Sequence, residues 1–170
     1  KMFSIMGGIG AFDLPVDLPD ITEAEYEAFS ALSIEDKLKQ IIIDLEYAIG
    51  LDPELTEAYY YLGVAYAQTL NREKAIEAFE KSIVVEPQRE DSYTILCLFL
   101  GETGRYEEAQ KIANLFRDSF PENRERYYYL TSLTYYHQGE FAKTIENGEK
   151  LLLISEDDSW VSLLLARAYF

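Results

Sequence analysis

One feature limits the fold of this chain more than any other: residues of three kinds recur at steps of 34 positions. The recurring residues are Pro53, Pro87 and Pro121, Leu62, Leu96 and Leu130, and Tyr59, Tyr93 and Tyr127. Three independent markers in one register are not expected by chance. A period of about 20 to 50 residues is typical of repeat architectures, in which each unit packs on its neighbours. The chain is therefore predicted to be an array of similar units.

The clearest unit runs from Thr56 to Pro87. Its marked positions are Tyr59, Leu62, Gly63, Tyr66, Ala75, Phe79 and Pro87. This spacing resembles the tetratricopeptide repeat, in which two antiparallel helices cross closely at small residues while large residues fill the space between them. The resemblance implies an all-α fold, namely an α-α superhelix, which is a right-handed solenoid of antiparallel helix pairs.

This register divides the chain into six segments. They are an irregular apolar segment at 1–21, a degenerate helix pair at 22–55, repeats at 56–89 and 90–123, a divergent repeat at 124–158, and the first helix of an incomplete repeat at 159–170. The divergent repeat has a one-residue insertion between Thr134 and Gly139. Its second helix contains Gly148, and glycine there costs about 1 kcal/mol relative to alanine, so we expect this helix to be kinked or soft.

The two ends of the chain allow alternatives. Segment 1–21 is rich in glycine and proline but apolar, so it is either a tail or cap, or a strap that lies on the repeats of the same or a neighbouring molecule. Segment 159–170 lacks a pairing helix, which exposes an apolar face. We therefore expect that the natural chain continues past Phe170 or that another chain covers this end.

The charge of the chain restricts its partners. The net charge is −16 and the sequence pI is about 4.4, which argues against nucleic acid and anionic membrane and favours a basic or apolar protein or peptide. No apolar run reaches the roughly 20 residues of a membrane span. One cysteine, Cys97, permits no disulfide within the chain, so a reducing compartment is allowed and a cytoplasmic location is expected.

Residues that could carry out catalysis are few and scattered. His137 is the only histidine, and no cysteine or second histidine lies near it in the sequence. Cys97 occupies the close-packing position of Gly63, one repeat later, and is expected to be buried and inert. Acidic pairs such as Glu107-Glu108 lie near predicted helix starts, where the helix dipole favours them. We therefore expect no enzyme activity, no metal site and no cofactor.

The resemblance also implies where a partner binds. In tetratricopeptide proteins the first helix of each pair lines the concave groove, where partner peptides usually lie. By register, the groove positions are Tyr60, Val64, Gln68, Thr94, Leu98, Glu102, Tyr128, Ser132, Tyr135 or Tyr136, Leu163 and Arg167. These side chains are largely aromatic and apolar, and tyrosine suits recognition because it buries a large area at low entropic cost. Alternatively, several of these tyrosines pack between repeats. The Lys/Asn/Arg clamp with which some family members hold a carboxylate is not present at these positions.

Three functions are compatible with the sequence. The first, which we favour, is a non-enzymatic scaffold that binds a peptide or partner protein in the groove. The second is a structural module that self-associates through segment 1–21 or through the open C-terminal end. The third is the regulatory domain of a larger enzyme. Repeat folds host many functions, so the fold alone does not choose among them.

Overall fold

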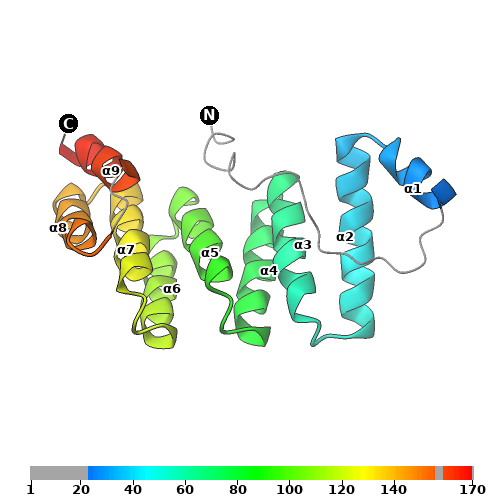
Figure 1. The fold of residues 1–170 in the computed structure, drawn as a ribbon, viewed down its shortest axis with the longest axis horizontal. Coiled ribbons are helices and arrows are strands. Elements are labelled where there is room, and N and C mark those ends of the chain that lie inside the picture. The colour runs from blue at the N-terminus through cyan, green and yellow to red at the C-terminus, as the bar shows by residue number, and fades with distance from the viewer. Residues whose placement is uncertain (1–22, 156–158, 170) are drawn as a thin grey trace. The chain divides into compact units, whose positions relative to one another are not determined.

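A computed structural model of the chain describes residues 23–155 and 159–169, where all regular structure is helical. Figure 1 shows the helices, which are α1 (Glu23–Ser30), α2 (Ile34–Leu51), α3 (Thr56–Gln68), α4 (Arg72–Val85), α5 (Glu90–Glu102), α6 (Tyr106–Ser119), α7 (Arg124–Gln138), α8 (Phe141–Leu152) and α9 (Ser159–Tyr169). The prediction of an all-α helical-repeat fold is confirmed. Within the described part, no helix has both the length and the apolar character that crossing a membrane requires.

The chain divides into two compact units, residues 1–37 and 38–170. In the first unit, α1 is followed by the start of α2, where the Asp36 backbone N–H donates to Ser33 Oγ at 3.1 Å. Ser33 is thus the N-cap of α2, because its side chain satisfies a backbone donor that has no partner within the helix. The Lys37 ammonium donates to the Ser30 carbonyl at 2.9 Å. The predicted segment 1–21 lies outside the described residues.

The second unit is built from successive helix pairs. Helix α3 packs on α4, α5 on α6, and α7 on α8, while α9 packs on α8 and touches α7. Neighbouring pairs meet through contacts of α4 with α5, of α6 with α7, and of α5 with α7. Among the first helices, α7 contacts both α5 and α9, whereas α4 lies between α3 and α5 (Figure 1). Helix α7 is longer than α3 and α5, which accommodates the extra residue of the third repeat.

The turns around the first two pairs repeat the same hydrogen bond. The Tyr59 hydroxyl donates to the Pro53 carbonyl at 3.2 Å, and 34 residues later the Tyr93 hydroxyl donates to the Pro87 carbonyl at 3.0 Å. Each tyrosine thus ties the first helix of its pair to the turn that precedes it. The tyrosine and proline markers share one period because, in each of these two repeats, the tyrosine forms a hydrogen bond with the proline.

Glycine allows two of the helix crossings to be close. A Cβ added at Gly63 in α3 would lie 2.7 Å from the Phe79 ring of α4. A Cβ added at Gly148 in α8 would lie 2.7 Å from Leu165 Cδ2 of α9. Helix α8 runs without interruption through Gly148, so this glycine has a packing reason that the sequence did not indicate. Leu165 belongs to a buried cluster with Leu151 and Val161.

One face of α9 is uncovered in the described part of the chain. By the repeat register, Ala166 and Tyr169 correspond to Gly63 and Tyr66 of α3. Gly63 and Tyr66 are buried, whereas Ala166 is exposed and Tyr169 retains 61% of its accessible surface. The difference arises because α4 packs on the corresponding face of α3.

Candidate functional site

The predicted groove residues lie on α3, α5, α7 and α9, which are the first helices of their pairs. We call their set the groove face. Three of its members are buried: Val64 (4% exposed), Thr94 (9%) and Ser132 (0%). The others are half-buried or exposed, namely Tyr60, Gln68, Leu98, Glu102, Tyr128, Tyr135, Tyr136, Leu163 and Arg167. The accessible members are therefore mostly aromatic and aliphatic side chains.

Tyr60 in α3 is held between an aromatic core and a cation. Its ring meets the buried Phe79 ring at a centroid distance of 6.0 Å, and the Arg89 guanidinium lies 5.0 Å above its centroid. Arg89 Nη2 is also 3.7 Å from Glu57 Oε1. Burial and the charge of Asp91 raise the pKa of Tyr60, and Arg89 partly offsets this. Tyr60 is therefore neutral at physiological pH and keeps its hydroxyl proton for donation.

Tyr128 in α7 combines packing between repeats with partial exposure. Its side chain packs against the buried cluster of Leu151, Val161 and Leu165. The Arg124 guanidinium donates from Nη2 to the Tyr128 hydroxyl at 3.2 Å and lies 5.8 Å from the ring centroid. The alternative that these tyrosines pack between repeats thus applies to Tyr128 in part, because one side of its ring packs on the buried cluster.

An arginine that the sequence reasoning did not select also reaches the groove face. Arg126 in the first turn of α7 donates from Nη1 to Thr94 Oγ1 of α5 at 3.3 Å. Its positive charge partly offsets the rise that burial causes in the pKa of Tyr129. Aligning the repeats at steps of 34 could have identified it, because Ala58 and Ser92 occupy its position in the first two repeats.

The last turns of α5 and α7 meet at His137. The imidazole Cδ2 lies 3.2 Å from the point where a Cβ on Gly101 would stand, so glycine leaves room for the ring. Burial lowers the pKa of His137, and the nearby charge of Glu102 partly offsets this. The histidine is thus neutral at pH 7 and packs between neighbouring repeats. His137 is therefore a packing residue at this interface.

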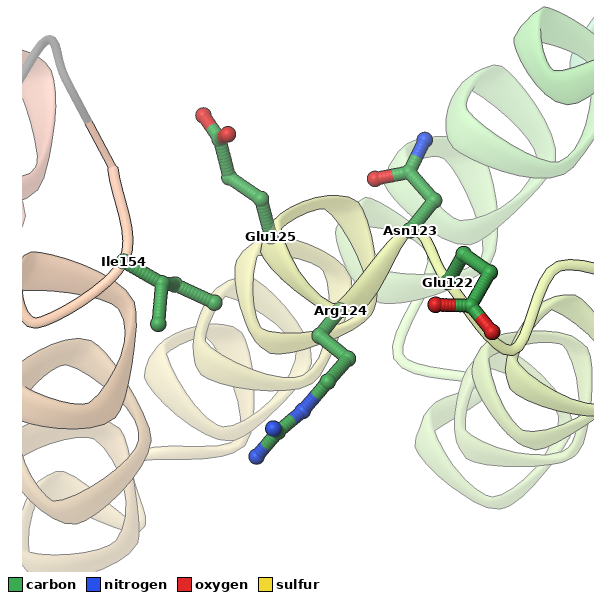
Figure 2. A pocket seen from close by; sticks show the side chains of 5 residues that line it. All are labelled: Glu122, Asn123, Arg124, Glu125 and Ile154. Carbon is green, nitrogen blue, oxygen red and sulfur yellow. The ribbon is translucent and has the colours of Figure 1, made fainter.

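A shallow hollow of about 520 Å³ lies where the α6–α7 and α8–α9 turns approach each other. Figure 2 shows its lining residues, Glu122, Asn123, Arg124, Glu125 and Ile154, with Arg124 and Glu125 directed to opposite sides of the start of α7. The Ser155 hydroxyl donates to Glu125 Oε1 at 3.1 Å. These side chains diverge, so the hollow is a surface depression between turns and not a candidate reaction centre.

Burial makes the single cysteine a packing residue. The Cys97 side chain is 3% exposed, and its Sγ lies 3.4 Å from the Ala109 carbonyl oxygen of α6. Burial raises the pKa of the thiol, which disfavours the thiolate that nucleophilic or metal chemistry needs. Within residues 23–155 and 159–169, no group of three or more histidine, cysteine and acidic side chains is arranged to hold a metal ion.

A family model for the tetratricopeptide repeat matches residues 56–89, the segment that contains α3 and α4. This segment is a tetratricopeptide repeat. The resemblance inferred from Tyr59, Leu62, Gly63, Ala75 and Phe79 is thereby confirmed. A search of curated proteins gives no match to the chain.

Solved structures of similar fold include the crystal structure of MamA, at a TM-score of 0.67 and 20% sequence identity, covering 89% of this chain and 85% of that one. MamA from residue 41 to its end, from Desulfovibrio magneticus RS-1, is similar at a TM-score of 0.65 and 17% identity, covering 84% of this chain and 80% of that one. At these identities the similarity shows that the helical-repeat fold is shared.

Proposed function

We propose that this protein is a non-enzymatic scaffold that binds a segment of a partner protein on the groove face. One observation carries the proposal: each successive first helix carries, at one of its groove positions, a large apolar or aromatic side chain that is accessible. Tyr60 on α3, Leu98 on α5, Tyr128 on α7 and Leu163 on α9 are all half-buried or exposed. Leu163 retains 55% of its accessible surface. Tyrosine is enriched among the residues that carry most of the energy of protein recognition, and apolar side chains around it exclude water.

The tyrosines are positioned before any partner binds. Arg89 lies over Tyr60 at 5.0 Å, and Lys143 lies over Tyr135 at 5.1 Å. Cation–π contacts of this type are worth about 0.5–1 kcal/mol at exposed sites, and they restrict the rings. A restricted ring loses less entropy when a partner covers it. The groove face thus offers hydroxyl-bearing aromatic surfaces that are already ordered.

The partner segment is expected to be mainly apolar and to carry basic residues outside its apolar contacts. The net charge of −16 accelerates the approach of a basic segment and disfavours a polyacidic one. A non-catalytic role is consistent with the buried thiol of Cys97 and the packed imidazole of His137. The apolar contacts themselves supply most of the affinity, since exposed ion pairs contribute little.

The test is affinity capture from lysate of the source organism with wild type and the Tyr60→Ala/Leu98→Arg variant. The proposal predicts that a protein captured by wild type is lost by this variant. A matched control changes the outward faces of α4 and α6 by Val84→Ala/Leu115→Arg, because these side chains are 74% and 44% exposed. The control is expected to capture as wild type does, and circular dichroism checks that both variants are folded. Loss of capture only in the control would place binding on the second helices and reject the proposal.

A further inference from the structure

Two positions of the repeat register carry an exceptional residue, one in α5 and one in α7. At the first, Tyr60 and Tyr128 of the outer repeats are replaced by the smaller Thr94 in the middle repeat. At the second, the small residues Ala58 and Ser92 are replaced by Arg126 in the third repeat. The two altered residues meet, because Arg126 Nη1 donates to Thr94 Oγ1 at 3.3 Å. The guanidinium thus contacts α5 at the register position where α3 carries Tyr60.

The packing at this position differs between the two successive interfaces. Between the first two repeats, the equivalent residue Ser92 is fully buried and its hydroxyl lies 2.7 Å from that of Ser82. One repeat later, the position of Ser82 is taken by Phe116, whose side chain is also fully buried. At the position of Ser92, Arg126 is half-buried, and its guanidinium reaches Thr94 on α5.

The Arg126 guanidinium is half-buried and makes no ion pair with a described carboxylate. This is unusual in a chain with 31 acidic residues. Glu90 is occupied elsewhere, since its Oε2 accepts from Asn123 Nδ2 at 2.8 Å. Arginine in the first turn of a helix is also disfavoured by the helix dipole. A guanidinium has five donors in a planar fork that matches a carboxylate, and the Thr94 contact uses one nitrogen.

We propose that Arg126, supported by Thr94, binds one carboxylate of the partner segment, and that this carboxylate belongs to an aspartate or glutamate within the segment. Thr94 holds the guanidinium in place, because its hydroxyl also donates to the Glu90 carbonyl at 3.2 Å. Groove-face residues lie on helices before and after α7 in the repeat order, with Tyr60 on α3 and Leu163 on α9. A segment that spans this face passes over Arg126 with its interior, so the carboxylate comes from a side chain and not from a chain end.

This inference rests on the proposed function and refines its partner. A single carboxylate at the middle of the segment gives register, because only one position along the segment can meet Arg126. The net charge of −16 still disfavours further acidic residues. The expected partner segment therefore has apolar residues on both sides of one acidic residue.

The test uses a random peptide library displayed on phage and selected on the purified full chain. A selected peptide is synthesised in three forms: unchanged, with its acidic residue replaced by the matching amide, and with an amidated C-terminus. Binding of each form to wild type, Arg126→Gln and Lys111→Gln is measured by fluorescence anisotropy. Lys111 is an exposed lysine of α6, so Lys111→Gln changes the net charge by the same amount away from the groove face.

We expect wild type and Lys111→Gln to bind the unchanged peptide about tenfold more tightly than the side-chain amide form, as a charge-assisted bidentate contact implies. Arg126→Gln should bind both forms with the same weakened affinity, and C-terminal amidation should have no effect. An equal preference for the acidic form in Arg126→Gln would overturn the assignment. A preference lost on C-terminal amidation would also overturn it, because the carboxylate would then be a chain end.

A further variant separates this inference from the function on which it rests. If Tyr60→Ala/Leu98→Arg abolishes binding while the carboxylate has no effect, the groove face stands and the role of Arg126 is rejected. If Tyr60→Ala/Leu98→Arg binds the selected peptides as wild type does, the groove face itself is rejected. Selection of no peptide by wild type rejects both.

Discussion

The first two repeats of the second unit solve the same packing problem with exchanged residues. In the repeat at 56–89 the contact is made by Gly63, Phe79 and Ser82, and at the same positions of 90–123 stand Cys97, Ala113 and Phe116. All six residues are buried. In the repeat at 56–89 the large side chain, Phe79, meets Gly63. In the repeat at 90–123 the large side chain is Phe116, three positions later in the register, and the smaller Cys97 and Ala113 stand at the positions of Gly63 and Phe79. The exchange indicates that the three buried side chains of each repeat together fill a similar volume, although the residue at each single position differs in size.

The exchange also alters the neighbouring contacts. Phe79 stacks near Tyr60 and Phe99, at centroid distances of 6.0 and 6.1 Å. Phe116 instead joins Tyr93 at 5.7 Å and Phe120 at 4.8 Å. The large side chain of the first repeat therefore supports the groove face through Tyr60. The large side chain of the second repeat supports the turn that leads to α7.

The largest expected effect comes from removing either ring. Phe79→Ala and Phe116→Ala should each lower the free energy of unfolding by about 3–5 kcal/mol, because each leaves a cavity in a fully buried site. Urea denaturation followed by circular dichroism measures the loss. Phe79→Ala should in addition weaken partner binding, since Tyr60 loses its support. A loss below about 1 kcal/mol at either position would show that the two sites are not equivalent core positions.

A smaller effect is expected from filling the crossing of the first repeat. Gly63→Ala should destabilise the protein by about 1–3 kcal/mol, because the new Cβ would lie 2.7 Å from the Phe79 ring. In a Phe79→Ala background, the same change should stabilise by about 1 kcal/mol, since the ring is gone and alanine favours helix. Thermal unfolding of the four proteins measures this reversal. The same sign in both backgrounds would refute the exchange of volume between the two positions.

The buried hydroxyl pair between the repeats should have an effect of similar size. Ser82→Ala leaves the Ser92 hydroxyl buried without its partner at 2.7 Å, which should cost about 1–3 kcal/mol. The Ser82→Ala/Ser92→Ala double variant should cost less than twice that amount, because it leaves no buried hydroxyl without a partner. A double-mutant cycle by urea denaturation measures the coupling. Strict additivity would mean that the two hydroxyls do not interact.

The smallest expected effect lies in the turns between the paired helices. Leu70 has φ of 60°, and Gly104, one repeat later, has φ of 79°. Glycine adopts this left-handed conformation without strain, whereas leucine does not. Leu70→Gly should therefore stabilise the protein by about 0.5–1 kcal/mol, and Gly104→Leu should destabilise it by a similar or larger amount. Differential scanning calorimetry would contradict this if Leu70→Gly lowered the melting temperature.

The fold was predictable because the repeat markers are residues that make local contacts. The hydroxyls of Tyr59 and Tyr93 donate hydrogen bonds to the carbonyl of the proline that precedes their helix, and Gly63 packs closely against the Phe79 ring. Such contacts depend on residues close in sequence, so spacing reveals them. The packing role of Gly148 was not predictable, because the side chain it meets, Leu165, belongs to the next helix pair and no local pattern links them.

The candidate site was predictable only in part, for a related reason. The register placed Tyr60, Leu98 and Tyr135 on first helices, where they remain accessible. It could not show that Val64 and Ser132 are buried, because neighbouring helices cover them. It also missed Arg126, whose role depends on the replacement of a tyrosine by Thr94 on another helix. The repeat pattern gives the positions of the groove-face residues, and the departures from it give the contacts that differ between repeats.

The most direct test of the central claim is site-specific photo-crosslinking in a lysate of the source organism. Benzoylphenylalanine replaces Tyr128 on the groove face in one protein and Val84 of α4 in another, because position 128 already holds a half-buried aromatic ring and Val84 is 74% exposed. Circular dichroism checks that both proteins are folded. The account predicts that a partner is crosslinked from position 128 and not from position 84. Crosslinking of the same partner from position 84 alone would contradict it.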